Sequence, residues 1–94
     1  MPYTYILECS DGSYYTGSTW NLDERISQHS TGYGSKYTNL HKPVKLVYFE
    51  EFDRMDAAYA REKQIQGWTR RKKKALIEGN FIDLVQFSKS KTEK

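Results

Sequence analysis

Five side chains of this 94-residue sequence have the types needed for phosphodiester chemistry. They are two tyrosines, an arginine, a histidine and a glutamate: Tyr5, Tyr15, Arg25, His29 and Glu62. A carboxylate can hold a hard divalent cation that keeps most of its waters. An arginine can neutralise the charge that develops on a phosphate, and a phenol or an imidazole can move protons. The sequence carries no zinc-type Cys/His spacing, Walker loop, Gly-x-Gly-x-x-Gly motif or nucleophile elbow, so these other sites are not indicated.

Each of these residues also has a plain structural interpretation. Arg25 and Glu62 could form an ion pair that only stabilises the fold. His29 could be a hydrogen-bonded helix residue, and Tyr5 and Tyr15 are of a type that is common in strands. The functional interpretation gains weight only if all five side chains fall in one constellation, which depends on the elements that carry them.

The two tyrosines fall in a predicted β-hairpin. Residues 3–8 and 13–18 are rich in Tyr, Thr and Ile, which favour strands. Asp11-Gly12 between them is a turn signal. The sequence therefore predicts two neighbouring antiparallel strands.

Arg25 and His29 fall in a helix that follows the hairpin. Asn21 is a favourable N-cap, and the helix is expected to run to about Thr31 and stop at Gly32. The spacing of four residues puts Arg25 and His29 on one helical stripe, shared with apolar residues. We expect both side chains to point inward or along the sheet edge, where they need polar partners.

Glu62 falls in a second predicted helix. A third strand is expected near residues 44–49, after which Asp53 is expected to cap the next helix and Gly67 to end it. Glu62 lies within the apolar stripe of that helix. A buried carboxylate costs several kcal/mol unless it is paired or bound to a metal, so Glu62 is the least expected residue in the sequence.

Thr69 is expected to cap a third helix, which Gly79 closes. This helix carries five consecutive cations that we expect to point outward. They are Arg70, Arg71, Lys72, Lys73 and Lys74. Residues 1–60 hold five Lys/Arg against eight Asp/Glu, and residues 61–94 hold ten against four, so the basic surplus is C-terminal. This asymmetry suggests a polyanionic partner, although a solvated helix face is the alternative.

The length and composition indicate one small cytoplasmic domain. Hydrophobic residues make up 37% of the chain, which is enough for one core, and no apolar run approaches a membrane span. One cysteine excludes an internal disulfide, and the N-terminus lacks the features of a signal peptide. We expect a domain at residues 1–87, including one more helical turn near residues 81–85, and a flexible polar tail at 88–94.

The order of these motifs resembles that of the GIY-YIG nuclease superfamily, which includes catalytic domains of excision-repair and homing endonucleases. Tyr3-Thr4-Tyr5 and Tyr15-Thr16-Gly17 resemble the two half-motifs that name the family, with Thr in place of Ile. An arginine and a histidine four residues apart on the first helix, and a glutamate on a later helix, complete the similarity. The stretches 34–38 and 67–77 resemble the small stand-alone bacterial branch.

The resemblance implies an α/β fold with a small, mainly antiparallel three-stranded sheet flanked by helices. It also implies a metal-dependent endonuclease that cuts DNA with Mg²⁺ or Mn²⁺, in repair or recombination. Glu62 would bind the metal, and Arg25 would stabilise the phosphorane. Tyr5 or Tyr15 would orient or deprotonate water with help from His29.

The same resemblance implies nucleic-acid partners, DNA before RNA, and leaves room for a protein partner. Lys36 and the basic helix would hold the phosphate backbone. Some repair nucleases of this family have a lysine where this chain has Ser18, and Asn80 is the candidate for a late asparagine of the family. Two other classes stay open: a nucleic-acid-binding module with a vestigial site, stacking bases on Tyr37 or Trp68, and a purely structural domain.

Overall fold

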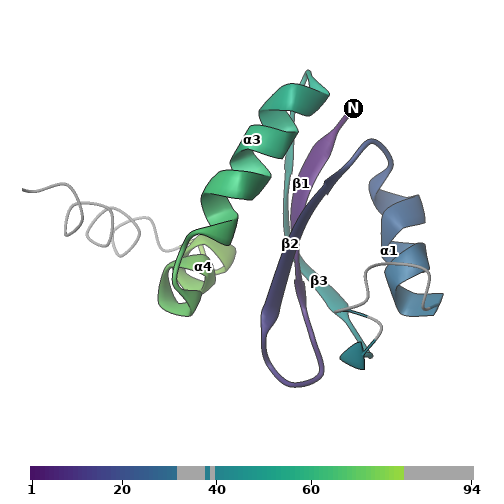
Figure 1. The fold of residues 1–94 in the computed structure, drawn as a ribbon, viewed down its shortest axis with the longest axis vertical. Coiled ribbons are helices and arrows are strands. Elements are labelled where there is room, and N and C mark those ends of the chain that lie inside the picture. Colours follow the sequence, from purple (N-terminus) through teal and green to yellow (C-terminus); the bar gives the residue numbers. More distant parts are fainter. Residues whose placement is uncertain (32–37, 39, 80–94) are drawn as a thin grey trace, which may run out of the picture.

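A three-stranded antiparallel sheet forms the centre of the fold (Figure 1). The structure, a computed structural model, describes residues 1–31, 38 and 40–79. The strands are β1 (Tyr3–Glu8), β2 (Tyr14–Thr19) and β3 (Lys45–Glu51), in the order β2-β1-β3. Strand β1 pairs with both neighbours, so β2 and β3 are edge strands. The α/β architecture with a small antiparallel sheet is therefore confirmed.

Helices cover both faces of the sheet (Figure 1). Helix α1 (Leu22–Thr31) lies on one face, and helices α3 (Met55–Gln66) and α4 (Arg70–Ile77) lie on the other. None of the helices within the described residues combines the length and the apolar character that crossing a membrane requires.

The predicted hairpin turn is present. Gly12 adopts a φ of 85°, a left-handed conformation that glycine accepts without strain. The Asp11 carboxylate accepts hydrogen bonds from the N–H and the hydroxyl of Ser13, at 3.0 and 2.6 Å. The Cys9 N–H donates to the Ser13 carbonyl at 2.8 Å, which closes the turn. Local side-chain bonding of this kind is why Asp-Gly signals a turn.

Two predicted helix caps are confirmed. The Asn21 side chain accepts a hydrogen bond from the Glu24 N–H at 3.0 Å at the start of α1. The Thr69 hydroxyl accepts one from the Lys72 N–H at 3.2 Å at the start of α4. Each cap satisfies a backbone donor that has no partner inside the helix.

The predicted cap of α3 is wrong. The N-cap residue is Arg54, in an extended conformation and with no capping side chain, and Asp53 precedes it. The Arg54 guanidinium instead reaches forward to the Asp56 carboxylate at 3.1 and 3.2 Å. The third strand also lies slightly later than predicted, at 45–51 in place of 44–49.

A small apolar core joins β1 to the two helices on its far side from α1. Ile6, Ile65 and Leu76 are buried there, and Trp68 and Val47 are among the half-buried residues around them. Alternation along β1 sends Ile6 toward this core and its neighbour Tyr5 toward α1.

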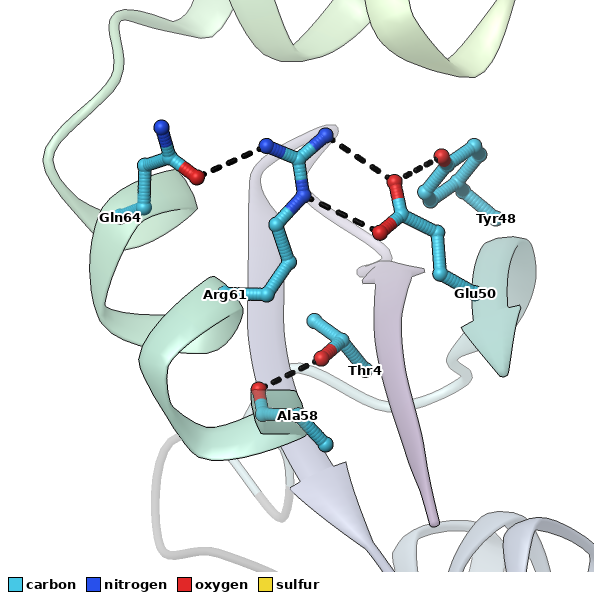
Figure 2. Close-up of polar contacts among 6 residues, drawn as sticks. All are labelled: Thr4, Tyr48, Glu50, Ala58, Arg61 and Gln64. Atoms are coloured by element: carbon cyan, nitrogen blue, oxygen red, sulfur yellow. Dashed lines mark hydrogen bonds and ion pairs between the residues drawn. The ribbon is translucent and has the colours of Figure 1, made fainter. Parts of the chain in front are cut away.

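A polar network ties α3 to strand β3 (Figure 2). Arg61 donates two hydrogen bonds to the Glu50 carboxylate, at 3.1 and 3.0 Å, and a third to Gln64 at 2.8 Å. Tyr48 donates to the same carboxylate. On the neighbouring strand, the buried Thr4 hydroxyl donates to the Ala58 carbonyl at 2.6 Å. These contacts fix the rotation of α3, and therefore the direction in which Glu62 points.

Several predicted features fall outside the described residues. They are the helix stop at Gly32, the basic residue Lys36, the aromatic residue Tyr37, the late asparagine Asn80, the helical turn at 81–85 and the polar tail at 88–94.

Candidate active site

The two tyrosines lie on the same face of the hairpin, toward α1. Tyr5 pairs with Gly17 across the two strands, and Tyr15 pairs with Leu7. The Tyr5 ring lies over Gly17, so closely that a Cβ there would be 2.5 Å from the phenol oxygen. Glycine is therefore required at position 17 for the Tyr5 hydroxyl to reach across the edge strand.

His29 holds the Tyr5 phenol in place. Its Nε2 lies 3.0 Å from the Tyr5 hydroxyl, and its Nδ1 lies 2.7 Å from the Thr38 hydroxyl. The ring also makes an edge contact with Tyr15, with centroids 5.3 Å apart. His29 is fully buried, and burial and the positive charge of Arg25 lower its pKa, so the neutral imidazole is favoured.

Charged groups on both sides of the site shift the pKa of Tyr5. The side chain is 1% exposed. Burial raises the pKa of Tyr5 well above its ordinary value, and Tyr15 and Glu62 act in the same direction. Arg25 opposes this increase in the pKa through its charge and through hydrogen bonding to the phenol. Tyr5 is therefore a neutral phenol close to both an arginine and a carboxylate.

The Glu62 carboxylate is held by neutral donors. The Ser18 hydroxyl donates to Oε1 at 2.5 Å, and the Gln66 amide donates to Oε2 at 2.8 Å. The Lys63 ammonium lies 3.7 Å from Oε2. The side chain is 12% exposed, and the buried residues Ala58 and Ile65 lie one turn before and after it on α3. Both oxygens have fixed directions, which suits a metal ligand.

The five predicted residues do not all approach from one side. Tyr5, Tyr15, Arg25 and His29 gather on the α1 face, whereas Glu62 comes from α3 on the opposite face (Figure 1). Within the described residues, the carboxylate of Glu62 pairs with Ser18, Gln66 and Lys63, and no ion pair joins it to Arg25. The interpretation of Arg25 and Glu62 as a structural ion pair is therefore not supported.

The two groups meet around edge strand β2. A cavity of about 280 Å³ lies beside this strand, and both Ser18 and Arg25 line it. The full lining is Ser18, Thr19, Trp20, Asn21, Glu24, Arg25, Gln28 and Met55. Ser18 therefore contacts Glu62 with its hydroxyl and also faces the space beside Arg25. A phosphate in this cavity would lie beside Arg25, with Glu62 reached through Ser18 and not in the cavity lining itself.

The donor set matches a weakly held hard cation. Within residues 1–31, 38 and 40–79, no three His, Cys, Asp or Glu side chains cluster as a metal cage. Mg²⁺ commonly uses one or two carboxylates together with water and substrate phosphates. A single oriented carboxylate that contacts Ser18, a residue of the cavity lining, fits that pattern.

The predicted basic helix face is only partly correct. Lys72 is 5% exposed and packs its ammonium 4.2 Å from the Trp68 ring, so it does not point outward. Lys73 is half-buried, whereas the remaining three cations, Arg70, Arg71 and Lys74, are exposed. Lys72 is four residues before Leu76 and three before Ala75, both buried, and this helical spacing was the available signal. Trp68 also lies under Arg61, so its ring is not an open stacking surface.

Three supporting residues were missed from sequence. Ser18 was noted only as a replacement for lysine, whereas Gln66 and Thr38 were not considered as site residues. Gln66 follows Glu62 by four residues, a spacing that brings helical side chains together. Thr38 had no comparable signal, because its contact with His29 depends on the tertiary fold.

Comparisons with known proteins agree with this fold. The GIY-YIG catalytic domain profile matches residues 1–75. A UPF0213 protein of Haloquadratum walsbyi is 50% identical over 76 residues, which cover 81% of this chain and 85% of that protein. A UPF0213 protein of Clostridium perfringens is 47% identical over 89 residues, covering 95% and 96%.

The structural comparison gives the same result. The solution NMR structure of a UPF0213 protein from Bacillus halodurans matches with a TM-score of 0.54 and 43% identity. The match covers 83% of this chain and 84% of the other. This chain therefore belongs to the GIY-YIG catalytic domain family, a nuclease superfamily, and is similar to the small UPF0213 proteins within it.

Proposed function

We propose that this protein is a metal-dependent endonuclease that hydrolyses DNA phosphodiester bonds at the edge of strand β2. The observation that carries the proposal is the meeting of Glu62 and Arg25 around Ser18, beside a cavity of about 280 Å³. Arg25 and Ser18 line this cavity, and Ser18 donates its hydroxyl hydrogen bond to Glu62, so a guanidinium and a carboxylate both lie close to the space where a phosphate could bind.

Glu62 would hold one Mg²⁺ or Mn²⁺ ion. When bound, such an ion polarises the phosphate and stabilises charge on the leaving oxygen. Ser18 and Gln66 are positioning residues for this carboxylate, because each donates a hydrogen bond to one of its oxygens. The ion would therefore find the carboxylate already oriented.

Arg25 acts on the phosphate from the other side. Water attacks phosphorus, the bond to the leaving oxygen breaks, and negative charge accumulates on the non-bridging oxygens during this step. The guanidinium of Arg25 lines the cavity and is close enough to Tyr5 to lower the pKa of that phenol. It is therefore positioned to neutralise the developing charge.

The two tyrosines have different roles. Tyr5 is buried and its pKa is raised, so it is unsuited to deprotonate water at neutral pH. We assign Tyr5 to orienting the phosphate or the attacking water through its hydroxyl, with neutral His29 as the positioning residue behind it. Tyr15 is half-buried, so it is the phenol that can reach water.

The biological setting is part of the proposal. Membership of the GIY-YIG family supports a nucleic-acid substrate, and the basic C-terminal third favours a polyanion. We place the activity in cytoplasmic DNA repair or recombination, with DNA preferred to RNA and with a protein partner that contributes to targeting.

A substrate panel tests the proposal. Duplex, flapped, branched and single-stranded DNA, and matched RNA, would be incubated with protein in Mg²⁺, Mn²⁺ or EDTA. We expect endonucleolytic products from DNA only with a divalent ion. A vestigial binding module would shift the same substrates in a gel without cutting any of them, and that result would remove the nuclease assignment.

A further inference from the structure

A row of contacts follows edge strand β2 away from the candidate active site. Every second side chain of β2 points to the face that α3 and α4 cover (Figure 1). These side chains belong to Tyr14, Thr16 and Ser18. Ser18 contacts Glu62, and the Thr16 carbonyl accepts a hydrogen bond from Gln66 at 3.3 Å. At the other end of the row, Tyr14 contacts α4.

The far end of this row is a basic pocket. A cavity of about 200 Å³ is lined by Ser13, Tyr14, Arg70 and Lys73. The Arg70 guanidinium lies 4.7 Å from the centre of the Tyr14 ring and donates to the Gly12 carbonyl. These contacts hold Arg70 in place beside the cavity without neutralising its charge.

Lys73 gives this pocket an unbalanced positive charge. The side chain is half-buried, and burial alone lowers its pKa. Among the residues that the structure describes, no carboxylate forms an ion pair with either Lys73 or Arg70. The acidic residue of the adjacent turn, Asp11, accepts from Ser13 and lies 3.5 Å from His41. A bound anion would compensate the two cations.

We propose that Arg70 and Lys73 bind one backbone phosphate of the nucleic acid, on the same strand that is cleaved. This inference rests on the proposed nuclease function. Tyr14 and Ser18 are four residues apart on β2, or about 13 Å at ~3.3 Å per residue. Stacked nucleotides advance about 3.4 Å along each strand, so the second phosphate lies up to about four nucleotides from the scissile bond.

The neighbouring lysines provide a matched control. Lys74 carries the same charge on the same helix but is exposed and does not line the cavity. Lys72 is unsuitable as a control, because it packs on Trp68 and its removal would disturb the fold. The comparison of K73Q with K74Q therefore separates a specific phosphate site from general charge attraction.

Binding is measured first, by fluorescence anisotropy of a labelled DNA oligonucleotide in EDTA, where cleavage is not expected. We expect K73Q to weaken binding about threefold to tenfold. The slope of the logarithm of the binding constant against the logarithm of the salt concentration should become shallower by the value of one phosphate contact, ~0.9 on a duplex or ~0.7 on a single strand. K74Q removes a cation of the same helix that lies outside the cavity, so it should weaken binding clearly less than K73Q does, and K73R should bind like the wild type. Equal losses in K73Q and K74Q, at unchanged melting temperatures, would overturn the proposal.

Cleavage then locates the phosphate relative to the scissile bond. Substrates are lengthened one nucleotide at a time on each side of the cut. In the wild type, kcat/KM should rise abruptly once the DNA on one side of the cut is long enough to reach the pocket. This abrupt rise should be absent from K73Q but present in K74Q. A smooth length dependence in all three proteins would overturn the inference but leave the nuclease assignment intact. If the wild type cuts nothing, the nuclease assignment fails and the anisotropy data decide the phosphate site alone.

Discussion

Replacing Gly17 by alanine is expected to disable the site through a single methyl group. A Cβ at this position would lie 2.5 Å from the Tyr5 phenol oxygen and 2.7 Å from its Cζ. Both distances are shorter than Cβ contacts found in proteins, so the ring must move. Tyr5 is buried and contacts His29, so the movement breaks the Tyr5–His29 hydrogen bond or displaces strand β2.

The cost of this change can be bounded. Inserting one methyl group into a well-packed interior typically costs about 1–3 kcal/mol. In a domain of this size, 1 kcal/mol corresponds to about 4–8 °C of melting temperature. We therefore expect G17A to melt at least about 4 °C below the wild type in a circular dichroism experiment. Cleavage should fall further than the folded fraction, because the phenol is no longer beside Arg25.

Gly67 offers the same chemical change without the clash. Its φ is −81°, and an added Cβ would lie 3.6 Å from the Gln64 carbonyl oxygen, an ordinary contact. G67A should be neutral or more stable by up to about 1 kcal/mol. In the double variant Y5L/G17A, the alanine should add little to the cost of Y5L, because the ring is gone. Equal melting temperatures for G17A and G67A, with wild-type cleavage in both, would refute the packing argument.

Two further predictions concern stability. R61M removes the two hydrogen bonds to Glu50 and the contact with Trp68. The free energy of unfolding, measured in urea, should therefore fall by about 1–3 kcal/mol, while cleavage per folded molecule stays the same. Unchanged stability would mean that the network in Figure 2 does not hold α3. Burial lowers the pKa of His29 below 6.5, so the unfolded chain binds more protons and stability should fall as the pH drops below about 6.5. H29N should lack this part of the pH dependence, and superimposable pH profiles of the two proteins would contradict a buried neutral imidazole.

Local signals predicted most of the fold. Asp11-Gly12, Asn21 and Thr69 form the predicted turn and caps, because each acts on backbone groups only two or three residues away. Asp53 was the exception. Aspartate is a favourable N-cap residue, but the N-cap of α3 is Arg54, one residue after Asp53. Contacts with β1 and β3 fix the position of this helix.

The site was predictable in residue type but not in arrangement. Sequence spacing placed Arg25 and His29 on one stripe of α1. It could not show that Glu62 lies across the sheet and reaches the site around β2, because the Ser18–Glu62 bond spans 44 residues. The basic run was misjudged in part because composition suggests solvent exposure, whereas helical periodicity turns Lys72 toward the core.

Glu62→Gln provides the most direct test of metal-dependent cleavage. The variant keeps an oxygen that can accept from the Gln66 amide, which also donates to the Thr16 carbonyl, and the Ser18 hydroxyl can rotate to accept a hydrogen bond from the new amide N–H. The fold and the DNA affinity in EDTA should therefore stay close to those of the wild type, whereas the charge that binds a hard cation is lost. The measurement is the Mg²⁺-dependent cleavage rate of E62Q relative to the wild type, on the best substrate of the panel. We predict no cleavage above the EDTA background, and cutting at the wild-type rate would contradict the role of Glu62 as the metal ligand.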